Sequence, residues 1–370
     1  MILLNQKVLT WIISAINGSK VMKEIRLSKS SLNSEEIKSV TSVLKNEYLG
    51  MGSDVGKFEN EIKDFIGTKN DVICVSSGTA ALHLALQACD LGENAEVLYP
   101  SITYVASPQS ISAAKAKPVA CDINLDTGFI DLKDAEKRIT KNTKAIMPVH
   151  YASDSSEMNS VYEFAKKYDL RVVEDAAHSF GSLRENKRIG FKGDLVCFSF
   201  DGIKNITSGE GGAVISSDKT IAEKIKNARL LGVEGDSNKR LEGKRSWSFD
   251  VNFQGWRYHM SNVMAAIGRE QLKKAITFDT KKKKLVNTYL KNLGKSKDIR
   301  LLDLNYNENF SHIFVIKVDK SKRDSLRKFL KKNFIQTGFH YTPCHLLAKF
   351  STDYPLENAE KFAEESLTLP

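Results

Sequence analysis

The amino-acid sequence predicts an α/β protein with a large domain built on a mostly parallel sheet and a smaller α/β domain after it. Three observations carry this prediction: strand-like and helix-like patterns alternate over residues 70–215, the strand-like runs are continuously apolar, and the pattern changes after residue 263. Continuous apolar strands are typical of parallel sheets that helices cover on both faces. The runs predicted as strands are DVICVSS, AEVLYPS, KPVACDI, TKAIMPVHY, RVVEDAA, LVCFSF and GGAVISS.

Helical patterns separate these strands, the clearest being GTAALHLALQAC, YVASPQSISAAK and the crossover helix SSEMNSVYEFAKKY. Beyond residue 263 a long basic helix leads to a strand, SHIFVIKVD, and to another helix, SKRDSLRKFLKKN. We therefore expect a large domain over residues 22–262 and a small C-terminal domain over residues 263–370.

The first 21 residues, MILLNQKVLTWIISAINGSKV, stand apart from this pattern. Their apolar run is shorter than the roughly 20 residues that a membrane span needs, and no A-x-A-like cleavage site follows it. A signal peptide and a start codon misassigned upstream of Met22 both stay open. We treat residues 1–21 as an extension outside the fold and expect no membrane partner.

Charge and cysteine content narrow the class of protein. The chain has 370 residues and a net charge of +10 at pH 7, which favours an anionic partner. Zinc-finger spacing and RNP-like motifs are both missing, so we expect no nucleic-acid partner. The five cysteines are scattered and never form a CxxC pair. This fits a reduced, cytoplasmic compartment and no structural metal site.

The stretch SSGTAALHLAL combines the end of a strand, a turn of small residues and the start of a helix. Unpaired backbone N–H groups and the helix dipole make such a start an anion site, and the Thr79 hydroxyl adds a donor beside Gly78. The alternative is an ordinary turn with a threonine N-cap.

Two further residues follow buried strands. Asp175, in RVVEDAAHSFGS, lies where a carboxylate is costly unless it is paired. It is a candidate helix cap, metal ligand or partner of a protonated ring nitrogen. The metal reading has little support, because His178 is the only other candidate ligand nearby in the sequence. Lys204, in SFDGIKNITSGEGGA, is a surface lysine in a glycine-rich loop or, if desolvated, a nucleophilic amine. The candidate anion site at Thr79, the strand-end Asp175 and the lysine in a glycine-rich loop follow one another in that order along the chain. Together they favour the nucleophilic amine.

These motifs resemble the DegT/DnrJ/EryC1/StrS family of pyridoxal-phosphate sugar aminotransferases. The likeness runs from about Ile25 over nearly the whole chain, through SSGTAALHLAL, PSITYVAS, VEDAAHSFGS, SFDGIKNITSGEGGAV, GWRYHMSNVMAAIGREQL, TGFHYTPCH and SLTLP. The spacing within VEDAAH and IKNITSGEGG looks most like that of enzymes acting on 4-keto nucleotide sugars.

The resemblance implies a fold-type I enzyme, active as a homodimer with shared sites, with pyridoxal 5'-phosphate (PLP) as cofactor. An amino group would pass from glutamate to a keto group, at C4, of a nucleotide-linked sugar. Lys204 would form the Schiff base and move the proton, and Asp175 would pair with the pyridinium nitrogen. Gly78, Thr79 and Ser199 would hold the phosphate.

The resemblance also assigns residues around the cofactor and substrate. Tyr104 would stack on the cofactor ring, although core packing is its alternative. His178 would lie beside the ring and support Asp175 or the ring hydroxyl, and its alternative is a satisfied buried histidine. Glu210 and His340 are expected at the substrate. Arg257 replaces a common asparagine that reaches the cofactor phosphate of the partner subunit, and a basic side chain there can pair with phosphate.

The sequence also departs from the family. His259 stands where arginine is usual, and Asp201 replaces a basic or aromatic residue of the lysine loop. Relatives continue for one more helix after the position of Pro370, so we expect that the chain lacks its last helix and that a longer form is more stable. Two alternative functions stay open: a relative that acts on a non-sugar keto compound, and a non-catalytic regulator with this fold.

Overall fold

The computed structural model describes residues 24–370, so the predicted extension over residues 1–21 lies outside the described part. A seven-stranded sheet with the order β1-β9-β8-β5-β4-β2-β3 forms the centre of the large part. The pairs β2–β3, β2–β4, β4–β5 and β5–β8 are parallel, whereas β9 runs antiparallel to both β1 and β8. The strands are β1 (Asp71–Val75), β2 (Glu96–Pro100), β3 (Lys117–Cys121), β4 (Thr143–Ile146), β5 (Arg171–Asp175), β8 (Leu195–Ser199) and β9 (Gly212–Ser216). The predicted α/β class with a mostly parallel sheet is confirmed.

Helices cover both faces of this sheet, which explains why its strands are apolar throughout. Alternate residues of β1 enter different clusters: Ile73 packs with α4 and α8, and Val72 packs with α3. Helix α7 and the neighbouring α6 cover the second face beside β4 and β5. The helices of the large part are α2 (Ser34–Lys45), α3 (Ser53–Ile66), α4 (Gly78–Ala88), α5 (Ala106–Ala113), α6 (Leu132–Lys137), α7 (Met158–Tyr168), α8 (Lys219–Ala228) and α9 (Asp236–Leu241), with a hairpin of β6 (Leu183–Arg184) and β7 (Lys187–Arg188).

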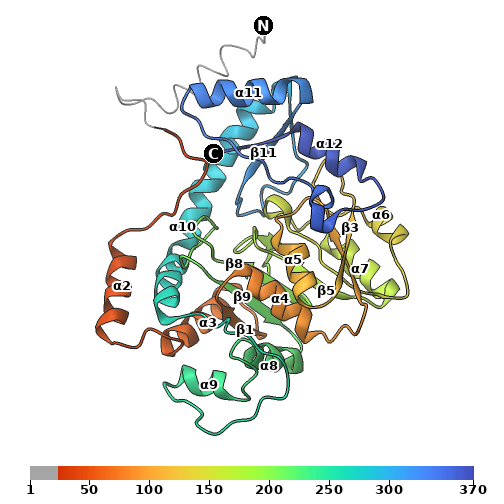
Figure 1. The fold of residues 1–370 in the computed structure, drawn as a ribbon. Helices are drawn as coiled ribbons and strands as arrows, with labels where there is room; N and C mark the ends of the chain where they lie inside the picture. The colour runs from red at the N-terminus through yellow and green to blue at the C-terminus, as the bar shows by residue number, and fades with distance from the viewer. Residues whose placement is uncertain (1–23) are drawn as a thin grey trace.

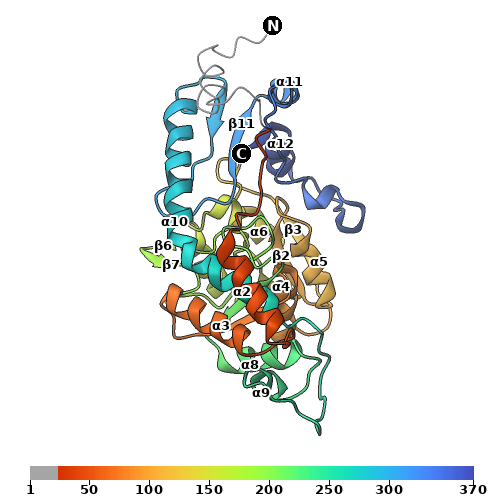
Figure 2. The ribbon, with the colours of Figure 1, turned by 90° about the vertical axis from the view of Figure 1, so that its left-hand side faces the viewer.

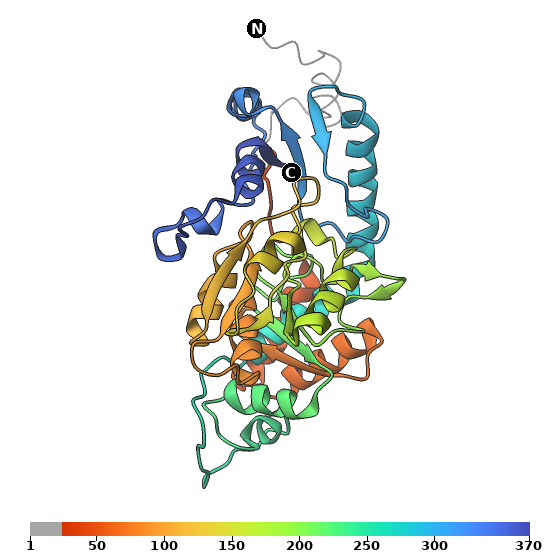
Figure 3. The same ribbon diagram turned by 90° about the vertical axis from the view of Figure 1, so that its right-hand side faces the viewer.

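The small part stands over one end of the large one, as three views of the ribbon agree (Figures 1, 2 and 3). Its antiparallel sheet has the order β10-β11-β12. Its elements are β10 (Ile299–Leu301), β11 (Phe314–Val318), α11 (Lys320–Lys332), α12 (Glu357–Glu365) and β12 (Ser366–Leu369).

The long helix α10 (Asn262–Leu293) joins the two parts (Figure 2). It begins at the N-cap Ser261, whose Oγ accepts from the Met264 amide at 3.2 Å. Its first turns pack on α2 and α3, and its last turns place Val286 and Leu293 in the core of the small sheet. The predicted domain boundary at residue 263 therefore falls in the first turn of a helix that contributes to both parts.

This topology brings the chemistry-bearing motifs to one edge. Asp175 ends β5 and Ser199 ends β8, and these two strands are parallel neighbours. The segment after β1 enters α4 at the same place, because Gly78 lies against Ser199. In α/β sheets ligands bind at the carboxyl ends of the strands. Within residues 24–370 we find no helix long and apolar enough to span a membrane.

Candidate active site

A cavity of about 490 Å³ opens at the carboxyl ends of β5 and β8. It is within the size range of small-molecule sites, about 300–1,000 Å³. Side chains from the large part and from the segment before β12 line it. Every site residue predicted for this subunit lies around it: Gly78, Thr79, Tyr104, Asp175, His178, Ser199, Lys204, Glu210 and His340.

The start of α4 forms an anion cradle on one wall. Ser77 caps the helix, and its Oγ accepts from the Ala80 amide at 3.1 Å. The amides of Gly78 and Thr79 precede any intrahelical acceptor and carry the positive end of the helix dipole. A Cβ at Gly78 would lie 2.8 Å from the Ser199 Cβ. Glycine is therefore needed here so that the helix start can approach β8.

Asp175 occupies the floor of the cavity and is only 6% exposed. Its Oδ2 accepts from the Ser107 hydroxyl at 2.8 Å, and its Oδ1 accepts from the Ala177 amide at 3.2 Å. Burial raises the pKa of the Asp175 carboxyl, and these hydrogen bonds and the charge of Lys204 oppose the rise. The two carboxylate oxygens can still accept further hydrogen bonds, which suits a protonated ring nitrogen. Sequence reasoning missed Ser107, which carries no motif of its own.

Lys204 reaches the cavity from the loop after β8. Burial lowers the pKa of the Lys204 amine, with Asp175 and Asp201 opposing, so its neutral, nucleophilic form is favoured. The loop is shaped by Asp201, whose Oδ1 accepts from the Ile203 amide at 3.2 Å and whose carbonyl accepts from the Lys204 amide at 3.1 Å. This turn gives Asp201 a local structural role at its unusual position.

Asn205, the residue after the lysine, fastens this loop and was not predicted. Its Nδ2 donates to the carbonyls of Phe310, His178 and Phe180 at 2.7, 3.2 and 3.2 Å. Its Oδ1 accepts from Lys282 Nζ at 3.0 Å. The side chain thus ties the lysine loop to the segment after β5 and to the small part.

Two aromatic rings accompany His178. Its Nε2 is 2.9 Å from the Tyr341 hydroxyl, and its ring centroid is 4.6 Å from that of His312. Burial lowers the pKa values of the His178 and His312 imidazoles well below the ordinary value, and the charge of Lys204 lowers them further. Both imidazoles are therefore neutral. His312 and Tyr341 come from the small part, and sequence reasoning missed both.

The remaining predicted residues, Tyr104, Glu210 and His340, also line the cavity. Tyr104 is 62% exposed, and its ring centroid is 5.8 Å from that of Tyr341. Burial raises the pKa of the Glu210 carboxyl, and the negative charge of Asp201 raises it further. His340 donates or accepts at Nδ1 with the Thr368 hydroxyl, 2.8 Å away, and burial lowers its pKa to about 4.

Arg257 is the one predicted site residue that does not line the cavity of its own subunit. It is exposed and forms an antiparallel bridge with Leu230, outside the central sheet. The neighbouring His259 bridges Val75, and burial, together with Arg257, lowers its pKa to about 4. This placement matches the expectation that Arg257 serves the cofactor phosphate of another subunit, which stays a prediction.

The donor set fits PLP. The α4 cradle suits a phosphate, Asp175 suits a pyridine nitrogen and the buried amine of Lys204 suits an aldehyde. The Nδ1 of His178 has no hydrogen-bond partner among the residues that the structure describes. Among residues 24–370 there is no group of three or more His, Cys, Asp or Glu side chains placed to hold a metal ion.

Comparisons with known proteins agree with this arrangement. An uncharacterized protein of Methanocaldococcus jannaschii, MJ1066, is 36% identical over 92% of this chain and 90% of its own length. Helicobacter pylori PseC, an aminotransferase involved in the biosynthesis of pseudoaminic acid, is 28% identical with a TM-score of 0.86 over 94% of each chain. Streptococcus pneumoniae Spr1654 in its PLP-form is 26% identical with a TM-score of 0.86, covering 94% of this chain and 93% of that one.

The family assignment rests on the sequence as well as the fold. The model of the DegT/DnrJ/EryC1/StrS aminotransferase family matches residues 30–370. The predicted fold type, enzyme class and PLP cofactor are thereby confirmed. The chain belongs to the DegT/DnrJ/EryC1/StrS aminotransferase family.

Proposed function

We propose that the protein is a PLP-dependent aminotransferase that moves an amino group from glutamate to the C4 keto group of a nucleotide-linked sugar. The observation that carries the proposal is the single cavity in which Lys204, Asp175 and the start of α4 meet. The similarity to PseC, an aminotransferase of pseudoaminic acid biosynthesis, supports a sugar as the acceptor. The net charge of +10 suits a substrate that carries phosphate groups.

The residues of this chain would divide the work as follows. These residues line one cavity: Gly78, Thr79 and Ser199 would hold the cofactor phosphate, Asp175 would pair with the ring nitrogen, and Lys204 would hold the aldehyde group. When bound, PLP supplies an aldehyde that accepts and returns the amino group and a ring that delocalises negative charge. Tyr104, which also lines the cavity, would pack beside that ring.

Lys204 is also the base of the reaction in this proposal. Burial lowers the pKa of the Lys204 amine, so its Nζ is better suited than an exposed lysine to take a proton from the donor carbon and return it to the acceptor carbon. Asp175 would keep a proton on the ring nitrogen. Its buried carboxylate can accept a further hydrogen bond in addition to those from Ser107 and Ala177. Glu210 and His340, which also line the cavity, would orient the substrate.

We further propose that the active form is a homodimer with shared sites. Arg257 is exposed and outside the cavity of its own subunit, which is what a residue serving the partner's site requires. Most soluble oligomers are symmetric dimers, so two such sites would form at once.

An absorbance spectrum tests the central proposal. The PLP-loaded protein should show the band of lysine-bound cofactor, and glutamate should convert it to the PMP form. Lys204→Ala should lack the lysine-bound band. A protein that binds PLP and does not respond to glutamate would contradict the proposal and favour the regulator. Screening 4-keto and 3-keto nucleotide sugars against the glutamate-treated protein then tests the acceptor and the position.

A further inference from the structure

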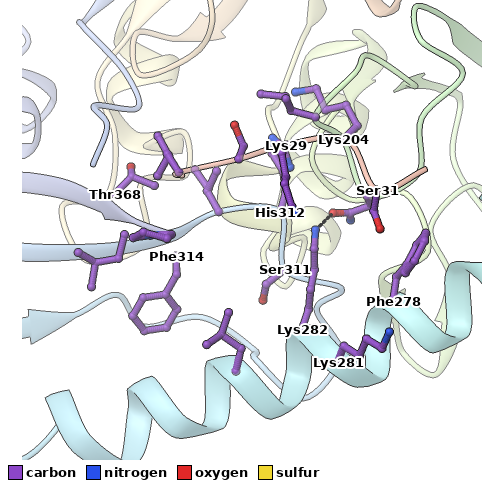
Figure 4. Close-up of a pocket in the computed structure, with 18 of the residues that line it drawn as sticks. Lys29, Ser31, Lys204, Phe278, Lys281, Lys282, Ser311, His312, Phe314 and Thr368 are labelled. Atoms are coloured by element: carbon purple, nitrogen blue, oxygen red, sulfur yellow. Dashed lines mark hydrogen bonds between the residues drawn. The ribbon is translucent and has the colours of Figure 1, made fainter. Parts of the chain in front are cut away.

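The two central residues of the candidate site have different surroundings. Lys204 lines a second cavity, of about 320 Å³, as well as the candidate site (Figure 4). Of these two cavities Asp175 lines only the candidate site. The strand end that carries Asp175 lies instead against three side chains that are each 0% exposed, those of His150, Glu174 and Ser179. The chemistry described above gives no role to these three side chains.

Glu174 is a buried carboxylate on the face of β5 opposite to Asp175, because neighbouring residues of a strand point to opposite faces. Its Oε1 accepts from the Tyr162 hydroxyl at 2.7 Å, and its Oε2 accepts from Arg184 Nη1 at 3.0 Å. His150 Nε2 lies 3.0 Å from the same Oε2. A buried ion pair adds little stability compared with apolar side chains of the same volume. Stability alone therefore does not explain a buried carboxylate at this place.

His150 connects Glu174 to the segment that follows Asp175. Its Nδ1 is 2.7 Å from the hydroxyl oxygen of Ser179. Its backbone amide donates to the Asp175 carbonyl at 3.0 Å, and the Asp175 amide donates to the Pro148 carbonyl at 2.9 Å. His150 thus contacts Asp175 through its backbone, and it contacts a residue on each side of Asp175 through its side chain.

The orientation of the Asp175 carboxylate depends on this segment. Its Oδ1 accepts from the amide of Ala177, which lies between Asp175 and Ser179 in the chain. A displacement of residues 174–179 would therefore turn the carboxylate. Burial raises the pKa of the Asp175 carboxyl, and His150 is among the groups whose charge opposes this rise. A charge-assisted hydrogen bond is strong only within a narrow range of distance and angle, so such a turn would weaken it.

We propose that His150, held between Glu174 and Ser179, is a positioning residue that directs the Asp175 carboxylate at the pyridine nitrogen of PLP. The inference rests on the proposed role of Asp175 and extends it to side chains that do not line the cavity. Other elements, the start of α4 and the loop of Lys204, would hold the cofactor phosphate and aldehyde. Loss of the His150 side chain should therefore weaken the contact to the ring nitrogen more than the other contacts to the cofactor.

The test compares PLP with its deaza analogue, in which a C–H group replaces the ring nitrogen. Both compounds keep the phosphate and the aldehyde, so the ratio of their dissociation constants reports the contact to the ring nitrogen. Absorbance titration of the cofactor-free protein measures both constants. The wild type should prefer PLP, and Asp175→Asn should lose most of this preference. His150→Leu should reduce it by about fivefold, as expected when a charged hydrogen bond is weakened.

His345→Leu is the matched control. His345 is also buried, with its Nδ1 2.7 Å from the Ser101 hydroxyl oxygen and its Nε2 3.2 Å from Glu360 Oε1, and it does not line the cavity. Both leucine variants should lower the melting temperature, because each removes a buried side chain with two polar contacts. The preference for PLP over the analogue should stay at the wild-type value in His345→Leu.

Ser179→Ala removes only the hydroxyl group beside His150 Nδ1, so it stays informative if His150→Leu does not fold. It should lower the preference for PLP as well. Wild-type preference in either of these two variants, once folded, would overturn the inference, as would an equal loss of preference in His345→Leu. Wild-type preference in Asp175→Asn would overturn the role of Asp175 too. The glutamate-driven spectral change judges the proposed amino transfer separately, so its failure is distinguishable from failure of this inference.

Discussion

Lys204 illustrates how a single residue is placed for chemistry at the expense of stability. Its amine is buried enough to lower its pKa, although the charges of Asp175 and Asp201 oppose this. The folded state therefore binds the proton of this group more weakly than the unfolded chain does. Such a group reduces stability at pH values where the unfolded chain is protonated.

Replacement of this lysine should stabilise the cofactor-free protein. Because the folded-state pKa is depressed below the ordinary 10.5, the wild-type lysine costs free energy at neutral pH and stops costing it above that value. Lys204→Met should raise the free energy of unfolding by about 1 kcal/mol, or the melting temperature by roughly 2 °C, at pH 7.

Thermal denaturation across pH 7 to 11 is the measurement, with Lys284→Met, an exposed substitution on α10, as control. The gain for Lys204→Met should shrink as the pH rises past the ordinary lysine value, and the control should show no such trend. A Lys204→Met protein that melts below the wild type at pH 7 would refute this account of the site.

At the scale of elements, the cofactor phosphate depends on how closely α4 approaches β8. Gly78 begins the helix and Ser199 ends the strand, and only a hydrogen at position 78 fits between them. A methyl group there would lie 2.8 Å from the Ser199 Cβ, so the helix start must move away. The amides that face the phosphate would move with it.

Gly78→Ala should therefore weaken PLP binding by about tenfold, a cost typical of overpacking at a tight contact. Ser199→Gly removes the opposing Cβ, so the double variant should recover part of this loss relative to Ser199→Gly alone. Cofactor affinity measured by absorbance titration of the four proteins gives the coupling between the two sites. Losses that simply add would mean that the two Cβ atoms do not oppose each other.

At the scale of the whole molecule, the proposed homodimer would complete each site with a residue from the other subunit. Arg257 is exposed, and Trp247 and Phe249, ten and eight residues earlier in the chain, are 88% and 58% exposed. Exposed aromatic and arginine side chains are common at protein interfaces. An interface here would carry Arg257 to the partner's cavity.

Mixing two inactive variants tests this sharing. Lys204→Ala and Arg257→Ala should each be inactive or weakly active alone. After exchange of subunits, one site of each hybrid dimer joins an intact Lys204 to an intact Arg257, so about a quarter of wild-type activity should return. A mixture that stays as inactive as its components, although light scattering shows dimers, would place Arg257 outside the shared site.

Much of the fold and of the candidate site was predictable, because the sequence patterns that predict them lie within a few residues of the positions concerned. Strand-end residues such as Asp175 and Ser199 follow apolar runs, and the carboxyl ends of parallel strands meet at one edge, so strand order alone brings them together. The helix start at Gly78 carries its own turn and cap signals. The family resemblance added roles for these residues, which the match over residues 30–370 supports at the level of the family.

Only the tertiary structure decided the surroundings of these residues. Ser107 reaches Asp175, and Lys282 reaches Asn205, across 68 and 77 residues of chain. His312 enters the site from the small part. None of these residues has a neighbouring pattern that predicts its partner, because a long-range contact depends on how separate elements pack. The sequence by itself predicted the lysine, the strand-end aspartate and the helix start that line one cavity, and packing determined the charges and hydrogen bonds around them.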